Sequence, residues 1–147
     1  MRRNAQLSGI EKQFDKTTHL ITTTDARGVI TYANDEFIRV SGYQRDELIG
    51  KNHNIIRHPA MPAAAFKDLW QTLKQGRSWR GAVVNRCKNG DHYWVDAYVT
   101  PIMQDGRLIE YQSIRTYLQP AQRQRRAAAR PAAGRAAAGK TGSAGGG

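Results

Sequence analysis

Residues 79–117, WRGAVVNRCKNGDHYWVDAYVTPIMQDGRLIEYQSIRTY, decide the fold that we predict. The dipeptides Asn89-Gly90 and Asp105-Gly106 divide this stretch into three runs rich in β-branched and aromatic residues. Asn-Gly and Asp-Gly suit the tight turns that join neighbouring antiparallel strands. The stretch therefore predicts three consecutive antiparallel strands, at Trp79–Lys88, Asp91–Gln104 and Arg107–Tyr117.

The middle predicted strand has two different faces, because successive side chains of a strand point to opposite sides of the sheet. One face carries Tyr93, Val95, Ala97 and Val99, and the other carries Trp94, Asp96, Tyr98 and Thr100. We expect the first face, which is smaller and more apolar, to look inward.

Upstream, residues 19–33, HLITTTDARGVITYA, are two short β-branched runs around the turn at 25–28. Gly28 can adopt the positive φ that a tight turn demands, so we expect a first hairpin here. Asn34 or Asp35 then offers an N-cap for a short helix ended by Gly42. A second short helix is expected at Gln44–Ile49.

A longer helix is predicted to begin at Pro62 and to end at Gly76, since proline suits the first turn of a helix. Its apolar residues follow the helical spacing: Phe66, Leu69, Trp70 and Leu73. Pairing the first hairpin with the three later strands gives an α+β fold. We expect a five-stranded antiparallel sheet with the helices on one face and a cavity between them.

Composition divides the 147 residues into three parts, which are 1–18, a folded domain at 19–118 and a tail at 119–147. The tail is nearly all Ala, Gly, Arg, Pro and Gln, so we expect it to be disordered. The formal charge of +11 is mostly terminal, because the domain holds 13 basic residues against 10 acidic ones. That distribution predicts no specific nucleic-acid partner.

A single cysteine, Cys87, rules out an internal disulfide and a cysteine-based metal cluster. No stretch reaches the roughly 18 to 20 apolar residues of a membrane span, and residues 1–6 have no apolar signal-peptide core. We expect a cytoplasmic protein. No glycine-rich phosphate loop, activated nucleophile or close carboxylate pair is visible, so we predict that it is not an enzyme.

Residues 51–61, KNHNIIRHPAM, follow neither helical nor strand periodicity, so we expect an irregular loop. It concentrates two histidines, one arginine and two asparagines, which makes it the first candidate for a binding site.

These features resemble the Per-Arnt-Sim (PAS) sensor domains and, among them, the flavin-binding N-terminal domains of bacterial aerotaxis receptors. The resemblance rests on TTDARGVITYANDEF, SGYQRDELIGKNHNIIRHPAMP, FKDLWQTLKQG and NRCKNGDHYWVDAYVTPI, which together cover nearly all of residues 19–116. It implies FAD held between sheet and helices, with a redox state set by electron transport. It also implies that full-length relatives continue into a membrane anchor, a linker domain and a signalling module that talks to a chemotaxis kinase. We expect a homodimer or another PAS–PAS contact, a chemotaxis output module or partner protein, and a place at the inner face of the membrane through a partner. This chain departs from the pattern at Ala60, where the family's loop usually carries an acidic residue.

The resemblance also implies roles for single residues. Asn85 corresponds to the sheet asparagine that contacts the flavin pyrimidine edge, and Arg115 to the residue that reads protonation of flavin N5. His53 stands where light-sensing relatives carry their adduct-forming cysteine, so we expect no cysteinyl-flavin photochemistry.

Other candidate site residues follow from their chemistry, each beside an ordinary structural role. Arg57 can pair with a phosphate or with the pyrimidine carbonyls, or it can be a surface cation. Trp70 and Trp79 can stack on a ring or belong to the core, with Trp79 the stronger candidate. Asn34 can contact the cofactor or only cap its helix, and His58 can bond the cofactor or only fix its loop.

Two further function classes remain open at this point. PAS domains also hold haem through an axial histidine, and His53, His58 and His92 are available. A cofactor-free interaction module would instead fill the cavity with side chains and use its sheet surface for dimerisation.

Overall fold

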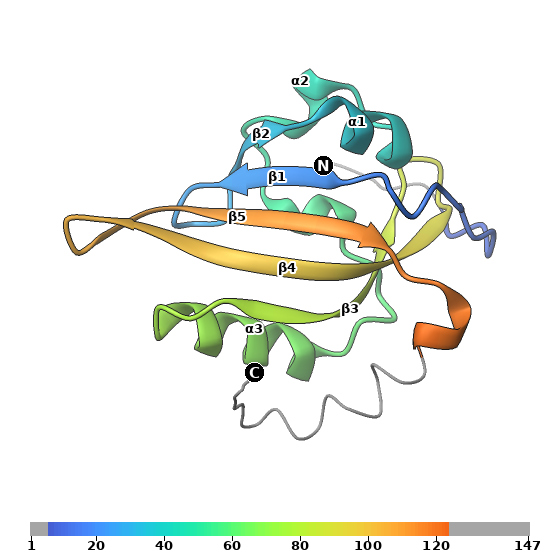
Figure 1. The fold of residues 1–147 in the computed structure, drawn as a ribbon. Helices are drawn as coiled ribbons and strands as arrows, with labels where there is room; N and C mark the ends of the chain where they lie inside the picture. Colours follow the sequence, from blue (N-terminus) through green and yellow to red (C-terminus); the bar gives the residue numbers. More distant parts are fainter. Residues whose placement is uncertain (1–5, 124–147) are drawn as a thin grey trace. The chain divides into compact units, whose positions relative to one another are not determined.

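The computed structural model describes residues 6–123 and shows five strands in one antiparallel sheet (Figure 1). They are β1 (Leu20–Thr24), β2 (Ile30–Ala33), β3 (Trp79–Arg86), β4 (His92–Gln104) and β5 (Arg107–Tyr117). Their order across the sheet is β2-β1-β5-β4-β3, so the first hairpin joins the later three strands through the β1–β5 pair. The predicted five-stranded antiparallel sheet is confirmed.

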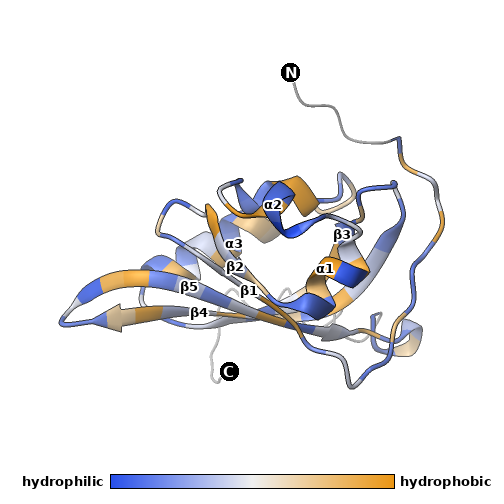
Figure 2. Cartoon of the chain, turned by 90° about the horizontal axis from the view of Figure 1, so that it is seen from above, coloured by the Kyte–Doolittle hydropathy of each residue, from blue (hydrophilic) through white to orange (hydrophobic). Residues whose placement is uncertain are grey.

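The helices lie on one face of this sheet, as Figure 2 shows from above. They are α1 (Asp35–Ser41), α2 (Arg45–Leu48), the 3₁₀ helix η1 (His53–Ile56) and α3 (Ala63–Lys74). The expectation of an irregular loop over residues 51–61 is wrong for η1. The Asn52 side chain accepts a hydrogen bond from the Asn54 backbone nitrogen at 3.0 Å and so starts one tight turn, which is too short to create a periodic pattern.

The predicted helix boundaries agree with the structure to within a few residues. Asn34 caps α1 by accepting from the Phe37 nitrogen, and Gly42 ends the helix in the left-handed conformation. Pro62 precedes α3 as its N-cap and is not its first residue.

The predicted inner face of β4 is buried. Tyr93 and Val95 are fully buried, Ala97 nearly so, and Val99 partly buried. Together with Leu20, Phe37 and Leu48, these residues belong to the main apolar core under the helices. The alternation of apolar and polar residues therefore predicted which side of the sheet the helices cover.

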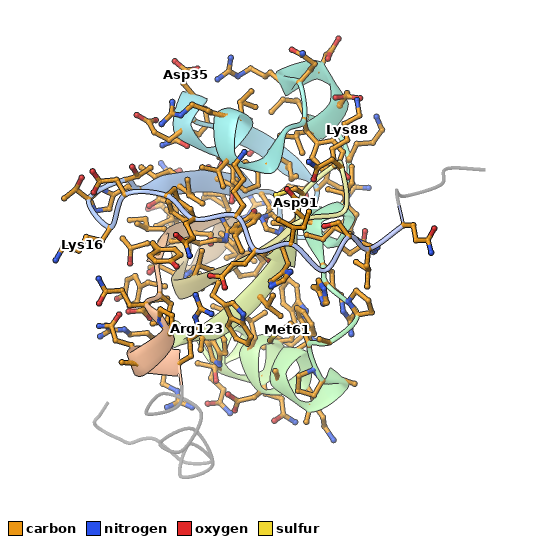
Figure 3. All side chains as sticks on the ribbon, turned by 90° about the vertical axis from the view of Figure 1, so that its right-hand side faces the viewer. Lys16, Asp35, Met61, Lys88, Asp91 and Arg123 are labelled. Carbon is orange, nitrogen blue, oxygen red and sulfur yellow. The ribbon has the colours of Figure 1, made fainter. Side chains whose placement is uncertain are left out.

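The free edge of β3 is covered by the chain that leads into α3. Arg57 forms an isolated antiparallel bridge with Asn85, and the Val84 nitrogen donates to the Met61 sulfur at 3.4 Å. Met61 is labelled in Figure 3, next to α3. Covering this edge removes unpaired backbone groups that would otherwise template pairing with another chain.

The described part of the N-terminal segment, residues 6–18, pairs with the start of β4. Glu11 forms a parallel bridge with His92, and the Ser8 hydroxyl donates to the Asp91 carboxylate at 2.6 Å. Phe14 packs edge-on against Tyr93 and Tyr117, with ring centroids 6.1 and 5.2 Å away. Figure 3 shows this segment running past Asp91.

By its contacts the chain divides into a unit that ends at Tyr117 and a second that starts at Leu118, one residue before the predicted boundary. Residues 120–123 form one helical turn, which differs from the disorder expected from Gln119 onward. The rest of the predicted tail, 124–147, lies outside the described residues, as do residues 1–5. Within residues 6–123, no helix has both the length and the apolar character needed to cross a membrane.

Candidate functional site

A cavity of about 320 Å³ lies between the inner face of the sheet and the α3 and η1 helices. Its apolar and aromatic lining comes from η1, α3 and three strands, and consists of Ile56, Phe66, Leu69, Trp70, Leu73, Trp79, Val83, Ala97, Val99 and Tyr111. Polar side chains line it as well, among them His53 from η1, Asn85 from β3, and Ser113 and Arg115 from β5. An apolar hollow with a few convergent polar groups is the usual form of a small-molecule site.

The structure brings six of the eight predicted site residues to this cavity. They are His53, Arg57, Trp70, Trp79, Asn85 and Arg115. Asn34 and His58 are not among its lining residues.

Asn34 has its polar atoms committed to the scaffold. Its side-chain oxygen accepts from the backbone nitrogens of Phe37 and Ile21, at 3.0 and 3.1 Å, and its amide nitrogen donates to the His19 carbonyl at 2.9 Å. Its role is to join α1 to β1, which is the structural alternative that the sequence left open.

His58 fixes its own loop. Its Nδ1 accepts from the Ala60 nitrogen at 3.0 Å, and its ring meets that of His92 edge-on at 5.8 Å. Burial lowers the pKa of His58, and the neighbouring His92 and Arg86 lower it further. Ala60, the point of departure from the family pattern, therefore takes part in this turn through its backbone alone.

Three polar atoms of the cavity residues have no hydrogen-bond partner within the described chain. They are Asn85 Nδ2, Ser113 Oγ and Arg115 Nη1. Asn85 and Arg115 are only 4% and 3% exposed, so water does not compensate them freely. Leaving a buried polar group unpaired costs about 1–3 kcal/mol. Buried polar atoms without a partner are candidates for hydrogen bonds to a ligand in the cavity.

Arg115 and His53 form a polar cluster with Thr22 at one wall of the cavity. Arg115 Nη2 lies 2.6 Å from His53 Nε2 and 3.2 Å from Thr22 Oγ1. A guanidinium only donates, so His53 Nε2 accepts and the proton of the neutral ring sits on Nδ1. Burial, and then the charge of Arg115, hold the pKa of His53 well below its usual value.

Arg115 is a buried cation that takes no part in the ion pairs found among residues 6–123. Burial lowers its pKa to about 10, so it stays charged at neutral pH. Its guanidinium carbon lies 5.4 Å from the centre of the Phe37 ring. A buried cation without a carboxylate beside it attracts negative charge placed in the cavity.

The aromatic walls are held by contacts of their own. Trp79 Nε1 donates to the Asp68 carboxylate at 2.8 Å, and Trp70 meets Tyr111 edge-on at 5.5 Å. Arg57 is exposed and stacks over the Phe66 ring at 4.0 Å. It therefore brings a positive charge to the rim of the cavity.

Cys87 does not line the cavity. Its thiol donates to the Val40 carbonyl at 3.3 Å, and burial raises its pKa to about 11. The thiolate is the reactive form of cysteine, so this buried thiol is inert at neutral pH.

The sequence interpretation missed Tyr111 and Ser113 as cavity residues. Both share the inner face of β5 with Arg115, since all three differ by two positions, and the alternation of β5 was sufficient to find them. It also missed Asn54, which reaches the cavity from η1, and Arg27 and Asn52, which reach it from turns. Turn residues carry no periodic signal, so only the fold places them there.

A family model described as PAS fold matches residues 30–115, which span every element from β2 into β5. The chain belongs to the PAS-fold family. The relatives that it matches include an aerotaxis receptor and a nitrogen fixation regulatory protein, which supports a PAS sensor domain in signalling. The aerotaxis receptor of Escherichia coli (strain K12) is 56% identical over 102 residues, which cover 69% of this chain and 20% of the receptor. The nitrogen fixation regulatory protein of Klebsiella pneumoniae is 38% identical over 92 residues, which cover 62% of this chain and 19% of that protein.

A solved structure, the light state of the blue-light photoreceptor Aureochrome1 LOV, superposes with a TM-score of 0.71. It covers 76% of this chain and 91% of that one at 18% identity, and so supports the fold alone. The chain spans about a fifth of the length of the curated relatives that it matches.

Proposed function

We propose that this PAS domain binds FAD in its cavity and passes the redox state of the flavin to a chemotaxis-type output. The observation that carries the proposal is the set of three unpaired polar atoms, on Asn85, Ser113 and Arg115, in a cavity with aromatic walls. The identity of 56% to an aerotaxis receptor supports the same assignment.

The cavity residues fit the parts of a flavin. The Asn85 amide suits the pyrimidine edge, which has both donor and acceptor atoms, and Trp79 offers an apolar surface to a flat ring. Arg57, at the rim, suits a phosphate or a pyrimidine carbonyl. When bound, the flavin would supply reversible electron exchange and visible absorption. We propose that the domain senses the redox state and does not turn over a substrate.

Arg115 is the residue that we propose reads the redox state. Negative charge on a bound flavin would be attracted by the buried guanidinium of Arg115, whose Nη1 has no hydrogen-bond partner and whose Nη2 holds His53 and Thr22. Turning Nη1 toward that charge changes the bonds of Nη2. Since Arg115 is two residues from the end of β5, the change lies close to the segment that follows the domain.

The geometry favours flavin over haem. His53 is the histidine that lines the cavity, and its Nε2 already accepts from Arg115. His58 and His92 are not among the cavity-lining residues. The cavity volume of about 320 Å³ likewise argues against a module whose interior is filled by its own side chains.

Partner and location belong to the proposal as well. We propose a homodimer or another PAS–PAS contact, a chemotaxis signalling partner, and a cytoplasmic site at the inner face of the membrane through that partner. The 56% identity to an aerotaxis receptor supports the chemotaxis signalling partner.

An absorption spectrum of the purified full chain tests cofactor binding. We expect oxidised-flavin bands near 370 and 450 nm, as free flavins show, which bleach on reduction, either directly or after refolding with excess FAD. Asn85→Leu should weaken FAD binding at least about tenfold, equivalent to about 1.4 kcal/mol, because it removes the amide and leaves the flavin edge unpaired.

The matched control is Gln112→Leu, which changes an exposed polar residue of β5 in the same chemical way. It should bind FAD like the unaltered chain. A Soret band, or a chain that stays colourless after refolding with FAD, would contradict the proposal.

Arg115→Ala tests the redox role. We expect the chain to keep its FAD, while the potential for uptake of the first electron becomes more negative by about 60 mV or more, since 59 mV corresponds to about 1.4 kcal/mol for one electron. Arg115→Lys retains a positive charge and should shift the potential less. Loss of FAD together with Arg115, or an unchanged potential, would refute this role.

A further inference from the structure

Gly81 occupies the inner face of β3, two residues after Trp79, at a place where no side chain fits. A Cβ built on Gly81 would lie 2.5 Å from Cη2 and 2.7 Å from Cζ2 of the Trp79 indole. Real Cβ atoms essentially never approach other atoms so closely. Gly81 is not among the glycines with positive φ, so space and not backbone conformation requires a glycine here.

A glycine inside a strand has a cost of about 0.5–1 kcal/mol relative to alanine, because it loses more backbone freedom on folding. Such a glycine often marks a close approach by another group. In this chain that group is the ring of Trp79, which lies along β3 over the backbone of Gly81.

The Trp79 ring is also held from the opposite layer. Its Nε1 donates to Asp68 on α3 at 2.8 Å, and the residue is only 6% exposed. One contact therefore seats the ring on the sheet and another ties it to the helix that covers the cavity. Two fixed points set the plane of an indole more closely than either alone.

This seat determines the shape of the cavity wall. Trp79 lines the cavity while Gly81 does not, so the indole forms the wall above Gly81. Ala97, the register partner of Gly81 on β4, lines the cavity next to it. Any side chain on Gly81 would push the indole off the strand, and the space available to the ring is the cavity itself.

We infer that Gly81 and Asp68 are positioning residues, which hold the Trp79 indole against β3 and thereby keep the cavity open as a slot for a flat ring system. The ligand part of this inference rests on the proposed function. The position of Trp79 does not, and can be measured without a ligand.

A double-mutant cycle between Gly81→Ala and Trp79→Phe tests the ligand part. In the Trp79 chain, Gly81→Ala should weaken FAD binding at least tenfold, as measured by fluorescence titration. In the Trp79→Phe chain, the same change should weaken binding less than threefold, because phenylalanine lacks the outer ring atoms that collide. Equal losses in both chains, or no loss in either, would overturn the inference.

Tryptophan fluorescence tests the position of the ring without FAD. In a chain with Trp70→Phe and Trp94→Phe, Trp79 is the remaining tryptophan. Gly81→Ala should raise the acrylamide quenching constant of Trp79 at least twofold, with the far-ultraviolet circular dichroism unchanged. An unchanged quenching constant would overturn the inference. If the unaltered chain takes up no FAD, the proposed function fails, while quenching still decides where Trp79 lies.

Asp68 is tested in the same single-tryptophan chain. Asp68→Ala removes the acceptor for Trp79 Nε1 and should raise the quenching constant, whereas Asp68→Asn keeps a carbonyl acceptor and should restore most of the protection. Equal quenching in all three chains would overturn the role of Asp68.

Discussion

At the scale of single residues, the candidate site depends on the contrast between two neighbouring basic groups. Arg115 stays charged, although burial lowers its pKa to about 10. His53 is held neutral beside it, because burial and the Arg115 charge both lower its pKa. The pair therefore brings one positive charge to the cavity wall, and the neutral imidazole serves Arg115 as an acceptor.

This contrast predicts an acid-sensitive fold. Folding stability rises with pH wherever the unfolded chain binds more protons than the folded one. Unfolded His53 takes up a proton below about pH 6.5 while folded His53 does not, so stability is fully present above that pH and falls as the pH drops below it. We expect the free energy of unfolding to fall by up to about 1.4 kcal/mol per pH unit more than in His53→Gln, which cannot titrate but can still accept from Arg115.

Urea unfolding at pH 7.5, 6.5 and 5.5 measures this difference. His58→Gln is the control, because the pKa of His58 is also lowered, but less strongly, so most of the slope should remain. Parallel pH profiles for the unaltered chain and His53→Gln would show that His53 titrates alike in both states.

At the scale of elements, the turns decide which strands pair, and two of them can be compared directly. Gly90 and Gly106 both have positive φ, 97° and 76°. A Cβ on Gly106 would meet nothing within 4 Å, whereas a Cβ on Gly90 would lie 2.1 Å from the backbone oxygen of Gln6. The turn between β3 and β4 thus has a second task, which is to accommodate the N-terminal segment.

Replacing each glycine with alanine separates the two tasks. Gly106→Ala should lower the free energy of unfolding by about 1–2 kcal/mol, which is the cost of a left-handed non-glycine residue. Gly90→Ala should cost more, because it also displaces the N-terminal segment and breaks the hydrogen bond from the Ser8 nitrogen to the Gly90 carbonyl, now 3.1 Å long.

Hydrogen exchange of the Ser8 and Lys12 amides is the diagnostic measurement. The Ser8 amide donates to Gly90 in the turn, and the Lys12 amide donates to His92 at the start of β4. Both should exchange faster in Gly90→Ala, while Gly106→Ala should leave them protected. The same exchange rates in both variants would mean that Gly90 does not accommodate the segment.

At the scale of the whole unit ending at Tyr117, the sheet brings distant parts of the chain to one cavity. β1 pairs with β5, so Thr22 meets Arg115 across 93 positions of sequence. η1 adds His53 to the same cluster from between these two strands in the sequence. The cavity is thus closed by contacts between residues that are far apart in the sequence. Each helix and turn around it, in contrast, is formed by residues that are close together in the sequence.

The sequence by itself determined the elements of this protein. Turn dipeptides, helix caps and the alternation of β4 predicted the five strands, the helices α1, α2 and α3 and the buried face correctly, because each depends on contacts within a few residues. The polar residues in 51–61, the ring chemistry of Trp70 and Trp79, and the PAS resemblance together predicted six of the residues that line the cavity.

Only the tertiary structure decided how those residues act. It committed Asn34 and His58 to the scaffold, brought Arg27 and Asn52 to the cavity from turns, and showed that Gly81 lies beneath the Trp79 ring. Hydrogen-bond partners and close contacts join residues far apart in the chain, so they depend on packing, of which local sequence patterns carry no record.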